Sequence, residues 1–162
     1  MKMTTFNSDV KVTLRRINAK TVRTICSLCV ADNQKNFVAP NAISIAQAYF
    51  LKNAWFRAVC ADETPVGFVM LYEAPKRGLY YLWRFMIDAK YQGRGYGRRA
   101  LELGIKRVRK RPKAKALLLS VVRAEGGAEE FYRKFGFEFT GKIEDGEYVM
   151  KLDLLEHAST CK

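Results

Sequence analysis

The chain has 162 residues, of which 49% are hydrophobic and 28% charged, and its formal net charge is +13. This length fits one domain with a single core, and the composition is globular, which excludes a disordered chain. Neither a signal-peptide-like apolar segment in the first twenty residues nor a run of membrane-spanning length occurs, so we expect a cytoplasmic protein without a membrane partner.

The first half of the chain predicts a strand, two helices and an antiparallel hairpin. The segment from Val10 to Ile17 alternates as a strand, and Asn18 can cap a helix with apolar positions from Val22 to Cys29. Ser44 can cap a second helix that continues through Phe50. Two strands then flank a turn that contains Pro65, and their ranges are Trp55–Ala61 and Val66–Glu73.

The second half predicts strands that alternate with helices and then a closing hairpin. The apolar run Leu79–Ile87 reads as a central strand, and helices follow at Tyr96–Arg109 and Gly127–Phe135. Asp145-Gly146 is a strong two-residue hairpin signal. The remaining predicted strands are Ala116–Val122, Phe137–Glu144 and Glu147–Leu154.

These elements follow the order β α α β β β α β α β β, which predicts an α/β (α+β) fold with a mixed, mostly antiparallel seven-stranded sheet and about four helices. The helical crossover should make Leu79–Ile87 and Ala116–Val122 parallel neighbours. We expect a single domain over residues 1–162, with a flexible tail at 155–162.

The four cysteines are too few and too irregularly spaced for a disulfide framework. Cys26 and Cys29 form a CxxC, but there is no second ligand pair and the only histidine, His157, lies in the tail. No metal site is therefore predicted.

A glycine-rich loop between a strand and a helix is the strongest candidate site. Gly93, Gly95 and Gly97 can turn backbone N–H groups inward, and the helix start adds partial positive charge, which together suit an anion. Arg94, Arg98 and Arg99 add full charge beside them. The alternative is a tight turn followed by a solvated basic helix face.

The positive charge is concentrated in the segment that overlaps and follows these glycines. From Arg94 to Lys115 there are ten basic residues and one acid, and we call this segment the basic stripe. Such a stripe suits either a phosphorylated small molecule or a nucleic acid. Aromatic residues are distributed through the predicted strands and, apart from Tyr96, do not interleave with the stripe, which disfavours nucleic acid. The loop lacks the GxGxxG of dinucleotide-binding folds and the GxxxxGK[ST] of nucleotide hydrolases.

Two motifs carry a family resemblance. Residues 92–97, QGRGYG, match the QxxGxG pyrophosphate loop of the GNAT superfamily of N-acetyltransferases, and residues 128–137, AEEFYRKFGF, resemble the A-x-x-[LF]-Y-x-x-x-G-F segment of that family. The order of elements resembles the same fold from about Val10 to Leu154. This resemblance implies an N-acetyltransferase that uses acetyl-CoA as acetyl donor. It also implies that two copies of the chain can form a homodimer.

The resemblance also implies roles for individual residues. Tyr132 matches the general acid that protonates the departing thiolate. Main-chain groups of the central strand would pair with pantetheine and polarise the acetyl carbonyl, while the loop would hold the pyrophosphate and Lys134 the 3′-phosphate. The residues expected to bind acetyl-CoA are Phe85, Met86, Ile87, Gln92, Gly93, Arg94, Gly95, Tyr96, Gly97, Arg98 and Lys134.

Within the superfamily, the chain looks most similar to bacterial spermine/spermidine acetyltransferases, which implies a small-molecule amine substrate, with polyamines as the first class to test. Two positions depart from the pattern: Glu125 replaces an asparagine, and Trp83 stands where similar enzymes carry an acid. Asp32, Glu73 and Trp83 are the candidates for contact with the amine, and Glu125 and Glu129 are further acids that could line its pocket.

Three alternatives stay open from the sequence. The acceptor could be a protein or peptide amine, the chain could be a basic nucleic-acid-binding module, or it could bind acetyl-CoA without catalysing transfer.

Overall fold

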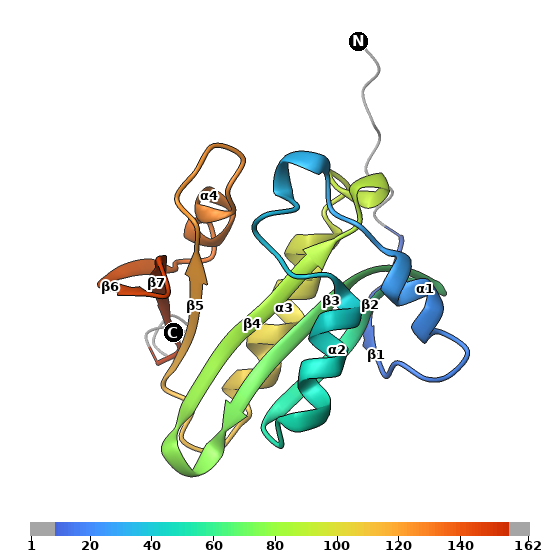
Figure 1. The fold of residues 1–162 in the computed structure, drawn as a ribbon. Coiled ribbons are helices and arrows are strands. Elements are labelled where there is room, and N and C mark those ends of the chain that lie inside the picture. The colour runs from blue at the N-terminus through green and yellow to red at the C-terminus, as the bar shows by residue number, and fades with distance from the viewer. Residues whose placement is uncertain (1–8, 156–162) are drawn as a thin grey trace.

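Seven strands form one mixed sheet in the computed structural model, which describes residues 9–155 (Figure 1). The sheet order is β1-β2-β3-β4-β5-β7-β6. The strands are β1 (Val12–Arg15), β2 (Ala54–Ala61), β3 (Thr64–Ala74), β4 (Leu79–Ile87), β5 (Ala116–Val121), β6 (Glu138–Glu144) and β7 (Glu147–Asp153). All neighbouring pairs are antiparallel except β4 and β5, which are parallel, as the crossover predicts.

Four α-helices and three short 3₁₀ helices connect the strands. The α-helices are α1 (Val22–Ser27), α2 (Asn41–Phe50), α3 (Tyr96–Arg109) and α4 (Glu129–Arg133). The 3₁₀ helices are η1 (Asp32–Gln34), η2 (Pro75–Arg77) and η3 (Ala89–Tyr91). The predicted fold class, the seven strands and the order of the main elements are therefore confirmed.

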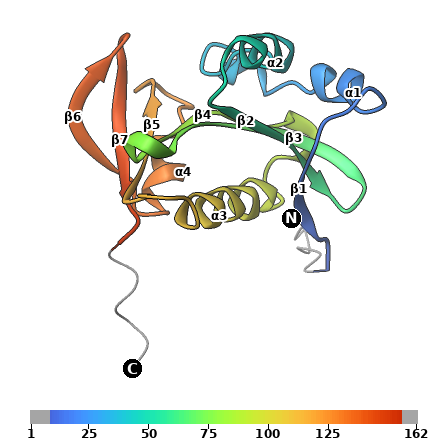
Figure 2. The same cartoon turned by 90° about the horizontal axis from the view of Figure 1, so that it is seen from below.

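The helices form a layer on each face of the sheet, with α1 and α2 on one side and α3 and α4 on the other (Figure 2). On α3, buried Leu101, Ile105 and Val108 recur three or four residues apart, which places them on one helical stripe against the sheet. On the opposite face, Ile25 of α1 packs with Phe68 and Met86 in a second core cluster. The sheet is thus buried on both faces at its centre.

Several predicted boundaries differ from the observed ones. α2 begins at Asn41, not at Ser44, because Pro40 occupies the N-cap position and the side-chain amide of Asn41 donates a hydrogen bond of 2.9 Å to the Ile25 carbonyl. Ser44 is instead buried inside the helix. α4 is shorter than predicted and begins at Glu129. The predicted tail lies outside the described residues from residue 156 onward.

Candidate active site

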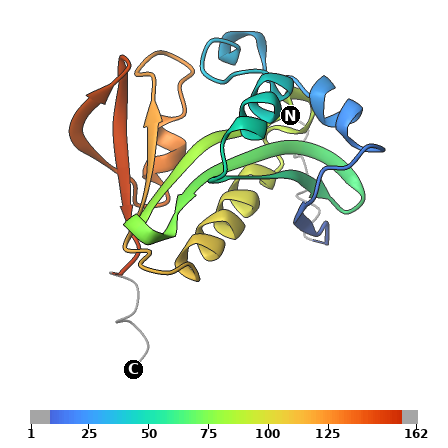
Figure 3. The same ribbon diagram turned by 60° about the horizontal axis from the view of Figure 1, so that its bottom comes forward.

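A cleft opens where β4 and β5 separate. Tyr81 and Leu118 form the pair that joins these strands, and beyond this pair β5 to β7 lean away from β1 to β4 (Figures 1 and 3). A β-bulge explains the separation: Met70 of β3 pairs with Arg84 and Leu71 pairs with Leu82, so Trp83 is an extra residue in β4. Bulges bend and twist the strand that carries them. The cleft has a volume of about 1350 Å³.

The end of β4 presents main-chain groups to this cleft. Phe85, Met86 and Ile87 pair with β3 on one side, and all three line the cleft on the other. Their N–H and C=O groups on the side of β5 have no partner strand in the described part of the chain. Extended ligands add to such strand edges by main-chain hydrogen bonds. The geometry therefore suits a linear chain with amide groups, such as pantetheine.

The glycine loop forms one end of the cleft. Gly93 and Gly95 have φ values of +74° and +77°, and Gly95 is the N-cap of α3. A Cβ atom at Gly93 would meet no heavy atom within 4 Å, so the loop backbone faces open space. Left-handed turns before a helix start direct consecutive N–H groups to one point, which is the arrangement that binds phosphate. The geometry of the loop therefore suits a phosphate group.

The arginines beside the loop differ in their placement. Arg98 lines the cleft and forms an ion pair of 3.1 Å with Glu102. The guanidinium of Arg94 lies 5.7 Å from the centre of the Tyr91 ring, outside the residues that line the cleft. Arg99 donates instead to the carbonyl of Val10, which lies just before the edge strand β1. Arg98 is thus the arginine best placed to meet a phosphate.

Two side chains hold the loop in place. Asp88, which is buried, accepts hydrogen bonds of 2.9 Å from the backbone N–H groups of Lys90 and Cys29. The side-chain amide of Gln92 donates to the Ile87 carbonyl at 2.9 Å and to the side-chain oxygen of Gln34 at 2.8 Å. Gln92 therefore links the loop both to the end of β4 and to η1.

Tyr132 lies on the wall of the cleft formed by α4. Its ring packs against Phe131 and Phe137 at centroid distances of 5.3 and 5.7 Å, and the residue is 8% exposed. Phe131 in turn stacks on Phe85 of β4 at a centroid distance of 6.0 Å, so the two rings connect α4 to the end of β4. Burial raises the pKa of the Tyr132 phenol. The group is therefore a neutral phenol at physiological pH and can only donate a proton.

The other end of the cleft carries carboxylates from the β6–β7 hairpin. Glu144, Asp145 and Glu147 line it, and a carboxylate oxygen of Glu147 accepts a short hydrogen bond from the hydroxyl of Ser120 on β5. Burial raises the pKa of Tyr81, whose hydroxyl also interacts with Ser120. The opposite wall is formed by Trp83, Arg84 and the segment 34–40.

The sequence did not single out these hairpin acids. Asp145 was recognised only as a turn residue, and Glu144 and Glu147 lie in strands where alternating charge is ordinary on a solvent face. Only the pairing of β7 with β5, which sets Tyr148 opposite Val121, brings the hairpin to the cleft. Asp88 was also missed, although an acid directly after an apolar strand and before a glycine loop is a recognisable cap signal.

The structure separates some predicted site residues from the cleft. Asp32 has a side chain that is 94% exposed and forms an ion pair of 2.6 Å with Lys35, which lowers its pKa. Glu73 is buried on the side of α3, where it pairs with Arg107 at 2.7 Å. Lys134 is exposed at the end of α4. None of these three predicted residues lines the cleft, whereas Trp83 does.

Residues 9–155 show neither a candidate metal site nor a candidate membrane span. No group of three or more His, Cys, Asp or Glu side chains in this part of the chain could hold a metal ion. No helix there has the length and apolar character needed to cross a membrane.

Comparison with known proteins agrees with this geometry. Residues 20–137 match the model of the acetyltransferase (GNAT) family. A spermine/spermidine N(1)-acetyltransferase of Bacillus subtilis is 30% identical over 140 residues, which cover 80% of this chain and 90% of the relative.

Two solved structures with the cofactor bound share the fold. The PaiA N-acetyltransferase of Thermoplasma acidophilum in complex with coenzyme A has a TM-score of 0.61 at 18% identity, covering 88% of this chain and 99% of that one. A GNAT family acetyltransferase of Elizabethkingia anophelis with acetyl-CoA bound has a TM-score of 0.63 at 16% identity, covering 91% and 99%. The chain belongs to the GNAT family and is an N-acetyltransferase that uses acetyl-CoA.

Proposed function

We propose that this enzyme transfers the acetyl group of acetyl-CoA to a primary amine of a polyamine. The observation that carries the proposal is the lining of one cleft, which combines a phosphate-binding loop and Tyr132 with the carboxylates of Glu144, Asp145 and Glu147. The Bacillus subtilis relative, named as a spermine/spermidine acetyltransferase, supports the same substrate class.

Acetyl-CoA supplies an acetyl group activated as a thioester. The main-chain N–H groups at Phe85 to Ile87 are placed to bind the acetyl carbonyl and to stabilise the negative charge that develops on it. Tyr132 gives its phenolic proton to the departing sulfur, and the proton that the nitrogen loses as it becomes an amide restores the phenol. Residues 92–98 and the α3 N-terminus hold the phosphates at a distance from the reaction.

The carboxylates of the β6–β7 hairpin suit a second, protonated nitrogen of the polyamine, not the nitrogen that attacks the thioester. The attacking amine must be neutral, and a carboxylate beside it would favour its charged form and so slow the attack. A second nitrogen of the same molecule stays protonated at neutral pH and needs a counter-charge, because the net charge of +13 repels a polycation. Glu147, oriented by Ser120, can provide it.

A panel of amines tests the proposal, with release of free thiol as the measurement. Spermidine, spermine and linear diamines should be acetylated with higher kcat/KM than monoamines of equal length, amino acids or peptides. Glu147→Gln should raise the KM for spermidine about tenfold, as the loss of a contact worth about 1.4 kcal/mol would. The KM for acetyl-CoA should not change.

Glu138→Gln is the matched control, because Glu138 is an exposed acid of the same hairpin that does not line the cleft. It should leave the KM for spermidine unchanged. Preferred acetylation of peptide N-termini or lysines would instead support a protein or peptide acceptor. Binding of acetyl-CoA without turnover of any amine would support an inactive relative of the family.

A further inference from the structure

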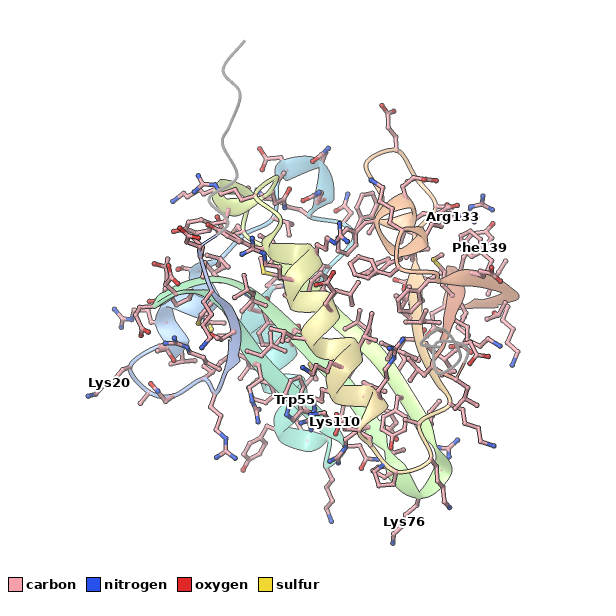
Figure 4. All side chains as sticks on the ribbon, turned by 180° about the vertical axis from the view of Figure 1, so that it is seen from behind. Lys20, Trp55, Lys76, Lys110, Arg133 and Phe139 are labelled. Carbon is pink, nitrogen blue, oxygen red and sulfur yellow. The ribbon has the colours of Figure 1, made fainter. Side chains whose placement is uncertain are left out.

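One end of the molecule gathers exposed basic side chains from four separate segments. These are the α2–β2 loop, η2, the last turn of α3 and the chain that leads into β5. Their exposed bases are Lys52, Lys76, Arg77, Arg109, Lys110, Lys113 and Lys115, and we call this surface the basic end. Figure 4 shows Lys76 and Lys110 toward the same lower end of the molecule, with Lys20 on another side.

Hydrogen bonds tie these segments together. The ammonium of Lys113 donates to the Lys76 carbonyl at 3.2 Å, which joins the segment after α3 to the β3–β4 turn. The backbone N–H of Glu73 near the end of β3 donates to the Asn53 carbonyl at 2.8 Å, which holds the α2–β2 loop beside the same turn. The fold therefore keeps the bases on one surface, although they are distant in sequence.

Binding of acetyl-CoA does not account for this charge. The phosphate loop lies at the start of α3 and the basic end at its finish, and a helix of 14 residues is about 21 Å long. Electrostatic interactions between exposed charges are largely screened beyond about 8 Å at physiological ionic strength. Direct contact with the phosphates of the cofactor therefore does not explain the bases at the far end of α3.

The acids nearest to the basic end do not neutralise it. Glu73 is 6% exposed and is shared by Arg107 at 2.7 Å and Arg111 at 3.3 Å. Asp153, opposite Ala116 across the sheet, accepts the backbone N–H of Leu155. Within residues 9–155, no ion pair engages any of the seven exposed bases. A helix C-terminus favours Arg109 and Lys110, but it does not explain the bases of the other segments.

Two aromatic rings are exposed next to these bases. Tyr49 and Phe50, which are 85% and 81% exposed, end α2 two residues before Lys52. Their rings meet edge to face with centroids 5.1 Å apart. Lysine and arginine that track phosphates, together with exposed rings on which bases stack, form the usual surface for single-stranded nucleic acid.

We propose that the basic end binds the phosphodiester backbone of single-stranded nucleic acid, with Tyr49 and Phe50 stacking on its bases. This activity is separate from acetyl transfer. The sequence alone disfavours such a partner because Tyr96 is the one aromatic residue in the stripe from Arg94 to Lys115. Folding adds Lys52, η2 and the two rings, which lie outside that stripe.

Fluorescence anisotropy with labelled single-stranded RNA and DNA oligonucleotides tests the proposal on the full chain. Binding should weaken steeply with salt. Lys76→Glu/Arg77→Glu/Lys110→Glu should reduce affinity at least tenfold and lower the salt slope by about one for each phosphate contact that is lost. Tyr49→Ala/Phe50→Ala should weaken binding while leaving the salt slope unchanged.

The matched control is Lys11→Glu/Lys20→Glu/Arg23→Glu, which changes the net charge equally at exposed bases elsewhere. It should reduce affinity much less. Equal loss in the two triple variants would overturn the proposal, since net charge alone would then explain binding. Preferential binding to vesicles of phosphatidylcholine and phosphatidylserine would overturn it in favour of a membrane surface. All variants should retain acetylation of the best amine, which confirms that they fold.

Discussion

Tyr132 is the residue whose environment most clearly defines a chemical role. A tyrosine in water has a pKa of about 10, and burial among Phe131 and Phe137 raises the pKa of Tyr132. The raised pKa means that the protonated form persists above pH 10. The phenol is thus available as an acid over the whole range in which the substrate amine loses its proton.

Replacing Tyr132 by phenylalanine removes this proton and little else, because the ring keeps its packing. We expect Tyr132→Phe to lower kcat by about 10²-fold, the usual size of a general-acid contribution, and to leave the Kd for acetyl-CoA unchanged. Stopped-flow and steady-state rates measure the first quantity and calorimetry the second. The wild-type rate should rise with pH up to about 10, the ordinary tyrosine pKa, as the amine deprotonates. A decline between pH 8 and 10 would contradict the role.

Individual residues show how far the sequence predicts the site. Gly93, Gly95 and Tyr132 belong to local motifs, and the family resemblance of these motifs predicted that they share one site; all three line the cleft. Glu147 belongs to no motif, and it reaches the cleft only because β7 pairs with β5. Glu73 was expected at the acceptor, but alternation along β3 turns its side chain to α3 while its neighbour Tyr72 lines the cleft. In a strand that is buried on both faces, the sequence pattern does not show which of two neighbouring side chains points to which face of the sheet.

At the scale of elements, the bulge at Trp83 and a glycine on the neighbouring strand together shape the end of β4. Gly67 pairs with Ile87, and a Cβ atom at Gly67 would lie 2.4 Å from the carbonyl oxygen of Met86. This distance is too short for a side chain, so any larger residue must displace β4. The glycine thus allows β3 and β4 to approach where the cofactor is expected to pair.

Gly67→Ala should therefore destabilise the protein by about 1–3 kcal/mol through overpacking and raise the KM for acetyl-CoA. Gly104→Ala is the matched comparison, because a Cβ at this buried position inside α3 meets no neighbouring atom within 4 Å. That change should stabilise the protein by about 0.5–1 kcal/mol. Urea unfolding gives the two free energies. Equal stability of Gly67→Ala and the wild type would show that β4 does not depend on this approach.

The elements themselves follow well from sequence where one local signal is strong. β4 and α3 have the predicted bounds, because a long apolar strand, a glycine loop and an amphipathic helix succeed one another without ambiguity. The bulge in β4 could not be predicted, since it depends on the register with β3 and leaves no mark in the sequence of either strand. The open cleft, which the bulge produces, was expected only from the family resemblance.

At the scale of the whole molecule, the two ends of the cleft carry charges of opposite sign. The glycine loop and Arg98, which we propose hold the cofactor, bring positive charge to one end of the cleft, whereas the hairpin from Glu138 to Asp153 contains five acids and two lysines. The overall charge of +13 attracts an anionic cofactor from a distance but repels a polycation. The amine is therefore expected to depend on the local field of the hairpin.

The dependence of kcat/KM on ionic strength separates the local field from the overall charge. If the hairpin acids dominate, added KCl should lower kcat/KM for spermidine, and lower it more steeply than for a monoamine, because salt screens an attraction. If the net charge dominates, salt should raise kcat/KM for spermidine by screening a repulsion. We expect the first result in the wild type. Glu144→Gln/Glu147→Gln should weaken or reverse the slope, since these two carboxylates line the cleft while the rest of the molecule stays basic.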